Sequence, residues 1–154
     1  MSTYKSYMRI ALEEARLAEL RGEIPVGAVL VNAEGHIIAR EGNRNKEYND
    51  PTAHAEILCI RKAFVKFKLH NLLNHSIYIT LEPCQICRAT LEETHIRRIL
   101  YGASNYLADS FKDIDYKSNF RTNGPKYEVY QGICEKESSA LLKKFFKKRR
   151  ASKN

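Results

Sequence analysis

The sequence lacks any apolar run that could cross a membrane. No stretch of its 154 residues approaches the roughly 18 consecutive apolar residues that a spanning helix needs. The N-terminus also lacks the apolar core of a secretion signal, because Glu13, Glu14 and Arg16 interrupt its first helical pattern. These absences predict a cytoplasmic protein with no membrane partner.

Cysteine is scarce, with only Cys59, Cys84, Cys87 and Cys134. In a reducing compartment, the Cys84-x-x-Cys87 pair favours a metal or redox site over a structural disulfide. Cys59 falls in an apolar helical run and Cys134 just after a predicted strand, so we expect both to be small buried side chains.

The sequence shows no internal repeat and no sign of disorder. Its hydrophobic share of 44% is ordinary for a globular protein, which excludes disordered, collagen-like and mini-protein classes. A chain of this length can bury a continuous core without disulfide support. We expect a single domain over residues 1–154.

Positive charge is concentrated near the C-terminus. The net charge is +8, and the last twenty residues hold eight of the 26 Lys and Arg but two of the 18 Asp and Glu. A nearly neutral body with a basic tail favours an anionic partner, nucleic acid before a membrane surface. A solvated helix end is the alternative interpretation.

Helical and strand patterns alternate along the chain. They predict helices over 3–20, 50–67, 83–94 and 135–150, and strands over 26–31, 36–40, 76–81, 97–101 and 126–131. Such alternation is typical of a three-layer α/β/α domain, here with a five-stranded mixed sheet. Asp50 as cap and Pro51 in the first turn predict that His54 and Glu56 lie in the first turn of their helix.

The connection over 102–124 shows no strong pattern. A loop of this length in a compact domain is usually functional. Its rings and cation can stack on bases or can simply pack against the domain: Tyr106, Phe111, Tyr116, Phe120 and Arg121.

His54, Cys84 and Cys87 form the ligand set of a catalytic zinc site, which keeps one tetrahedral position open for water. Glu56 is too close to His54 to ligate in the same direction but can move protons at that water. Placement at helix N-termini should lower the pKa of both thiols.

Two other interpretations of the Cys-x-x-Cys pair are weaker. A redox pair would leave His54 and Glu56 without a role. A structural zinc site usually needs a fourth protein ligand, and the remaining histidines offer no good candidate, since they fall in a polar linker or at a helix end: His70, His75 and His95.

His-Ala-Glu followed at this distance by Pro-Cys-x-x-Cys is the signature of the zinc-dependent cytidine deaminase superfamily. Longer runs resemble the bacterial tRNA-specific adenosine deaminases, and with them the resemblance covers essentially the whole chain: Pro25–Val31, Asp50–Glu56, Thr80–Cys84, and Phe145-Phe146 followed by basic residues.

The resemblance implies a homodimer with one Zn²⁺ per subunit. It would hydrolyse the wobble adenosine of a tRNA anticodon stem-loop to inosine, with the adenosine splayed into the pocket. Glu56 would carry protons from water to N1 and the departing amine. The resemblance further implies that Asn43 hydrogen-bonds the base and that main chain at Ala55 and Cys84 surrounds the reacting centre. Ile24 and Val26 would form a pocket wall, and Asn105 and Phe146 would also contact the substrate.

The chain departs from the family pattern at three places. Arg88 replaces the usual small residue after the second cysteine, and can pair with an acid or reach a phosphate. Asn105 replaces a usual aspartate, which removes a charge near the substrate ribose or backbone. Tyr106–Ser110 replace a glycine-rich segment. We expect the change at Asn105 to weaken the discrimination between RNA and DNA, so single-stranded DNA and other RNA stay open as partners.

Two alternative functions remain open. The first is a deaminase of a free base, nucleoside or nucleotide on the same fold. The second is a non-catalytic, zinc-stabilised RNA-binding module, for which the Glu56 carboxylate would have no use.

Overall fold

The computed structural model describes residues 2–105 and 126–153. Helices and strands alternate along them in this order: α1 (Thr3–Leu20), β1 (Gly27–Val31), β2 (Ile37–Gly42), α2 (Ala55–Phe67), β3 (Ser76–Leu81), α3 (Gln85–Glu93), β4 (Arg98–Ala103), β5 (Glu128–Tyr130) and α4 (Glu135–Ser152). Within these ranges, no helix is both long and apolar enough to cross a bilayer.

The strands of the described residues form one mixed five-stranded sheet in the order β2-β1-β3-β4-β5. β1 is antiparallel to both β2 and β3, whereas β3, β4 and β5 run parallel to one another. A tight turn joins β1 to β2, with Gly35 at φ +84° and the His36 N–H donating to Asn32 Oδ1 at 2.8 Å. The predicted mixed sheet is confirmed.

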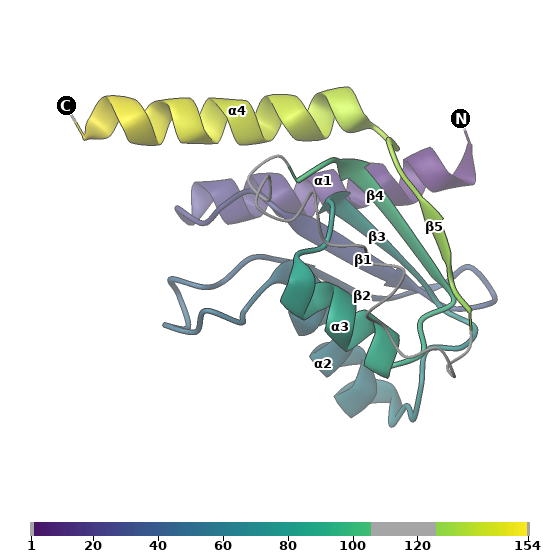
Figure 1. The fold of residues 1–154 in the computed structure, drawn as a ribbon. Coiled ribbons are helices and arrows are strands. Elements are labelled where there is room, and N and C mark those ends of the chain that lie inside the picture. Colours follow the sequence, from purple (N-terminus) through teal and green to yellow (C-terminus); the bar gives the residue numbers. More distant parts are fainter. Residues whose placement is uncertain (1, 106–125, 154) are drawn as a thin grey trace.

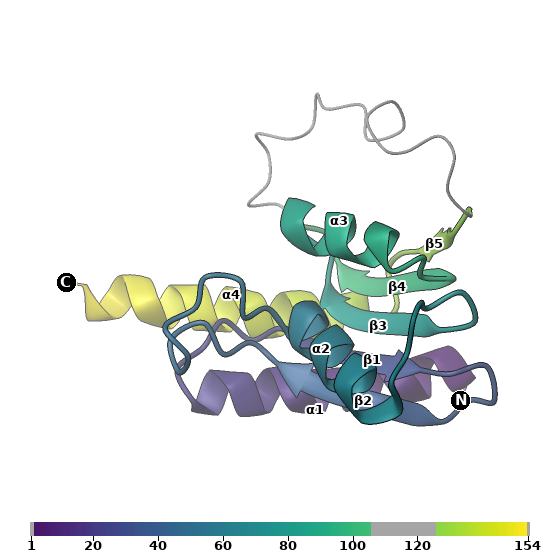
Figure 2. The same ribbon diagram turned by 90° about the horizontal axis from the view of Figure 1, so that it is seen from below.

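Helices cover both faces of the sheet, α1 and α4 one face and α2 and α3 the other (Figures 1 and 2). Side chains of β1 alternate between the two layers, as strand geometry requires. Ala28 and Leu30 join the core under α2, whereas Val29 and Val31 join Met8 and Ala11 of α1. The predicted three-layer α/β/α architecture is therefore confirmed.

α1 lies very close to β1 at Gly27. A Cβ atom at this position would fall 1.9 Å from the Ala11 carbonyl oxygen, so only glycine allows the helix to approach this far. The neighbouring strand helps to hold this point, since the Gly27 N–H donates to Thr80 Oγ1 at 3.1 Å.

Two helices begin later than the sequence predicted. α2 begins at Ala55 with His54 as its extended N-cap, so the expectation that His54 lies in the first turn is wrong. The reason is that Asp50 closes a local turn instead, accepting the Thr52 N–H at 2.8 Å and its hydroxyl at 2.7 Å. α3 likewise begins at Gln85, with Cys84 as N-cap rather than Pro83 as the opening residue.

Most of the 102–124 connection lies outside the described residues, including Tyr106–Ser110, Phe111, Tyr116, Phe120 and Arg121. Gly102 and Ala103 belong to β4 rather than to a loop, because Ala103 pairs with Leu81 of β3.

Candidate active site and metal centre

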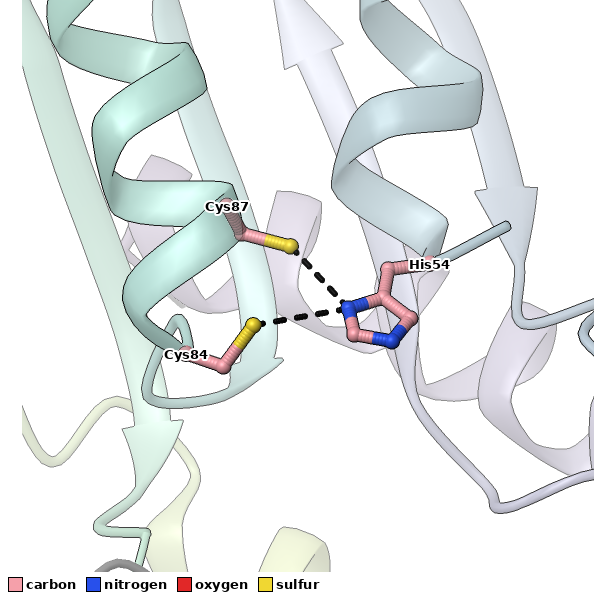
Figure 3. A group of neighbouring side chains, drawn as sticks. All are labelled: His54, Cys84 and Cys87. Atoms are coloured by element: carbon pink, nitrogen blue, oxygen red, sulfur yellow. Dashed lines mark hydrogen bonds between the residues drawn. The ribbon is translucent and has the colours of Figure 1, made fainter. Parts of the chain in front are cut away.

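Three side chains able to bind a metal converge where α2 and α3 begin (Figure 3). His54 and Cys84 are the N-caps of the two helices, and Cys87 lies in the first turn of α3. His54 Nδ1 lies 3.2 Å from Cys87 Sγ and 3.5 Å from Cys84 Sγ. The sheet brings these residues together because α2 and α3 pack side by side on the same face.

The geometry of this cluster fits a tetrahedral zinc ion. Zn–S bonds of about 2.3 Å and Zn–N bonds of about 2.0–2.1 Å put a nitrogen and a sulfur ligand roughly 3.5 Å apart. The observed N···S distances match this separation, and all three ligand atoms lie within 4.8 Å of one another. One imidazole and two thiols are also the ligand chemistry that zinc prefers.

The pKa values of the two thiols are shifted in opposite directions. A hydrogen bond from Cys87, supported by His54, lowers the pKa of Cys84 to about 4 although burial opposes the shift. The same hydrogen bond and burial raise the pKa of Cys87. The sequence predicted a lowered pKa at both positions, and the lowering is found at Cys84 but not at Cys87. Binding of a divalent cation deprotonates a thiol ligand.

Glu56 is a buried carboxyl group, 4% exposed, in the first turn of α2. Burial raises the pKa of Glu56 to about 7, against smaller opposing effects from its own backbone N–H and from His54. A carboxyl group that titrates near neutral pH can both accept and release a proton. Because Glu56 lines the same pocket as His54 and Cys84, that proton exchange is available to a bound substrate.

Asn43 is fixed at the pocket wall by hydrogen bonds on three sides. Its side-chain oxygen Oδ1 accepts the Ala55 N–H at 2.9 Å. Its own N–H donates to the Val26 carbonyl at 3.1 Å, and Arg21 donates to its carbonyl at 3.1 Å. Two conclusions follow. The Ala55 N–H is engaged within the protein, and the Asn43 Nδ2 group is the part left to face a ligand as a hydrogen-bond donor.

A pocket of about 1040 Å³ is lined by His54 and Cys84 of the candidate ligand set and by Glu56. Ile24 and Val26 line one side, and Asn105 lines it near the end of β4. α4 supplies a further wall whose members recur every three or four residues: Ser139, Leu142, Lys143, Phe146, Arg149, Arg150 and Lys153. All the residues predicted from the sequence to contact substrate therefore line this pocket, except Ala55. The Ala55 N–H donates to the Asn43 side chain instead.

Most residues of the α4 wall were not predicted from the sequence. Only Phe146 was named from it, although the helical spacing of the basic residues was already visible in the sequence. Glu82 falls in the Thr80–Cys84 run that resembles the family, but no role was predicted for it. Its carboxylate accepts the Asn105 N–H at 3.0 Å and so fixes the start of the segment after β4.

Arg88 lines the pocket beside the cysteine ligands. Its Nε lies 3.7 Å from a Glu92 carboxylate oxygen one turn further along α3, and its Nη2 donates to the Tyr127 hydroxyl at 3.4 Å. The Tyr127 hydroxyl in turn donates to Glu92. Of the two possibilities that the sequence left open, pairing with an acid is thus observed.

Comparison with known proteins agrees with this site. Residues 1–103 match the family described as the cytidine and deoxycytidylate deaminase zinc-binding region. A tRNA-specific adenosine deaminase of Agrobacterium fabrum is 41% identical over 150 residues, covering 97% of this chain and 98% of the relative. The tRNA-specific adenosine deaminase of Haemophilus influenzae is 42% identical over 152 residues, covering 95% and 84%.

A solved structure shares both the fold and the sequence. It comes from work on A-to-I editing by tRNA:A34 deaminases at the wobble position of transfer RNA. It superposes with a TM-score of 0.80 at 42% identity, covering 89% of this chain and 99% of the other. The chain therefore belongs to the zinc-binding cytidine and deoxycytidylate deaminase family, and within it to the bacterial tRNA-specific adenosine deaminases.

Proposed function

We propose that this protein hydrolyses adenosine to inosine in tRNA, at the wobble position of the anticodon. One observation carries the proposal most directly. The pocket that Glu56, His54 and Cys84 line is also lined by basic and aromatic residues of α4. A base bound in this pocket would therefore have its flanking phosphates near Lys143, Arg149 and Arg150. The two relatives described above are tRNA-specific adenosine deaminases, which supports the same substrate for this protein.

His54, Cys84 and Cys87 would hold one zinc ion per chain. Zinc supplies the Lewis acidity that makes a water molecule a nucleophile near neutral pH. Glu56 would take one proton from the attacking water and deliver it to N1 while the water oxygen bonds to C6 of adenine. Glu56 would then take the remaining proton of the new C6 hydroxyl and carry it to the amine as the C6–N bond breaks, so that adenosine and water yield inosine and ammonia.

The pocket walls would hold the flipped-out base in place. Asn43 donates through Nδ2 to an acceptor on the base, while Ile24 and Val26 cover it with apolar surface. Phe146 offers a ring beside the pocket mouth on which a base can stack. These contacts orient C6 toward the metal cluster and exclude bulk water from the reacting atoms.

We further propose that the protein is a cytoplasmic homodimer. Apolar side chains exposed on α2 and α3, Val65 at 81% and Ile86 at 50%, are available to such a contact. Sedimentation of the purified protein would test this, and a monomer at micromolar concentration would contradict it.

Sequencing of tRNA after incubation with the purified protein tests the substrate and the reaction together. We expect an A-to-G readout at the first anticodon position, together with one zinc ion per chain by elemental analysis. Ammonia release from guanine, cytosine or free nucleosides, with tRNA left unchanged, would instead favour the free-base alternative.

A further inference from the structure

Glu23 is a buried carboxylate that the proposed chemistry does not use. It lies between α1 and β1, is only 2% exposed, and does not line the pocket. Burying a carboxylate is costly unless hydrogen-bond donors surround it. The position of Glu23 therefore calls for an explanation in terms of what it holds.

Its side chain binds the backbone of the loop over residues 43–54. Glu23 Oε1 accepts the Lys46 N–H at 2.8 Å and the Glu47 N–H at 3.2 Å, and Oε2 accepts the Lys46 N–H at 3.2 Å. These N–H groups open a turn, in which the Tyr48 N–H donates to the Arg44 carbonyl at 3.0 Å. A carboxylate at this place stabilises the turn as an acidic cap stabilises the start of a helix.

The end of α1 fixes Glu23 itself. Gly22 has φ +80°, its N–H donates to the Glu19 carbonyl at 2.9 Å, and the Glu23 N–H donates to the Ala18 carbonyl at 3.0 Å. This pair of bonds is the Schellman motif, which gives the residue after the glycine a defined direction. α1 is thus a rigid support from which Glu23 reaches the loop.

The held loop carries a site residue at each end. Asn43 begins it and His54 ends it, and the Arg44 N–H closes it by donating to the Ala53 carbonyl at 3.0 Å. Arg21, which lies two residues before Glu23 at the same end of α1, donates a hydrogen bond to the Asn43 carbonyl. Any shift of the loop away from α1 would therefore move Asn43 relative to the metal cluster.

We propose that Glu23 is a positioning residue for the deaminase, which sets the place of Asn43 by clamping the 43–54 loop to α1. The proposal rests on the function proposed above and acts through Asn43, not through contact with substrate. Misplacement of about 1 Å by a distant change can cost up to roughly hundredfold in rate.

The test compares Glu23→Ala and Glu23→Gln with Glu34→Gln, a control in the exposed turn after β1. Rates on an anticodon hairpin RNA are normalised to bound zinc, so that loss of folded protein does not count. We expect Glu23→Ala to lower kcat/KM about tenfold or more, mainly through KM, and to speed amide hydrogen exchange at Lys46 and Glu47. Glu23→Gln keeps an acceptor oxygen and should stay within about threefold of the parent. An equal loss in both Glu23 variants would overturn the hydrogen-bond basis of the proposal.

A double variant separates positioning from general stability. If Glu23 acts through Asn43, then Glu23→Ala combined with Asn43→Ala should lose no more activity than Asn43→Ala alone. Additive losses, or an unchanged kcat/KM in Glu23→Ala, would overturn the proposal. An inactive parent protein would instead contradict the proposed function, so the two failures are distinguishable.

Discussion

The two halves of the pocket are built in different ways. The floor consists of buried or partly buried residues at the starts of α2 and α3, where His54 Nδ1 contacts both cysteine sulfurs: His54, Glu56, Cys84 and Cys87. The α4 wall presents cations that are exposed to solvent, Lys143, Arg149 and Arg150. Burial fixes geometry and shifts pKa values, whereas exposure leaves charges that act over a distance and are screened by salt. The floor therefore suits the chemistry, and the wall suits recognition of a long anionic substrate.

Loss of the metal should have the largest effect on the floor. We expect a chelator, or Cys84→Ala, to abolish deamination by at least about a thousandfold, and to lower the melting temperature because a folded-state ligand is removed. A rate assay and a thermal melt measure these two effects, and elemental analysis measures the zinc content. Cys134→Ser, outside the cluster, should keep its zinc; retention of zinc by Cys84→Ala would contradict the ligand assignment.

Glu56→Gln should come next. The amide keeps the shape of the side chain but cannot shuttle protons, so we expect kcat on tRNA to fall by about 10²–10⁴-fold. Zinc content should not change, since Glu56 is not assigned as a ligand. The matched control is Glu137→Gln, an exposed carboxylate in the first turn of α4. Unchanged ammonia release in Glu56→Gln would show that another group moves the protons.

Substitutions in the α4 wall should change RNA binding rather than the rate of the chemical step. We expect replacement of Lys143, Arg149 and Arg150 together by Gln to raise KM for a hairpin RNA about tenfold or more near physiological salt, with kcat nearly constant. The slope of log K against log salt concentration should fall by the amount expected for the loss of about three phosphate contacts. Kinetics at several salt concentrations measure both.

The same helix supplies the control for this experiment. Lys144, Lys147 and Lys148 are exposed but do not line the pocket, so their joint replacement by Gln removes the same charge from the other face. An equal rise of KM in both triple variants would mean that net charge, and not the wall, attracts the RNA.

Asn105→Asp should have the smallest effect and concerns the boundary between wall and floor. The Asn105 N–H is held by Glu82, so an aspartate would add charge at a fixed place on the pocket wall. We expect the ratio of RNA to DNA hairpin turnover to rise a few-fold, and Asn105→Ala to leave it near that of the parent. The same ratio in the parent and in Asn105→Asp would refute a role for this position in discrimination.

The sequence predicted the floor better than the supports around it. His54, Glu56 and the two cysteines are identified by spacing, because the zinc chemistry admits few residue types. The predicted start of α2 was wrong because Asp50, expected to cap the helix, binds Thr52 in a local turn. The predicted start of α3 was wrong because Cys84 is its N-cap. Competition between such local hydrogen bonds and helix capping is hard to resolve from sequence alone.

Long-range supports could not be predicted at all. Glu23 meets the N–H groups of Lys46 and Glu47 only because α1 and the loop are adjacent in the fold. A charged residue between a helix and a strand reads as solvent-exposed by composition. The α4 wall was a different kind of omission, because its spacing is local and only its partner surface was unknown.

Asn43 also serves as the remote cap of α2. His54 occupies the N-cap position of this helix, but its side chain makes no capping hydrogen bond. Asn43, far back in the sequence, satisfies the first free N–H of the helix instead. Removal of a helix cap typically costs about 1 kcal/mol. Under the proposed function, the Asn43 side chain would thus contribute both to fold stability and to base recognition. Selection for a new substrate at this position therefore also acts on the stability of the helix that supplies Glu56.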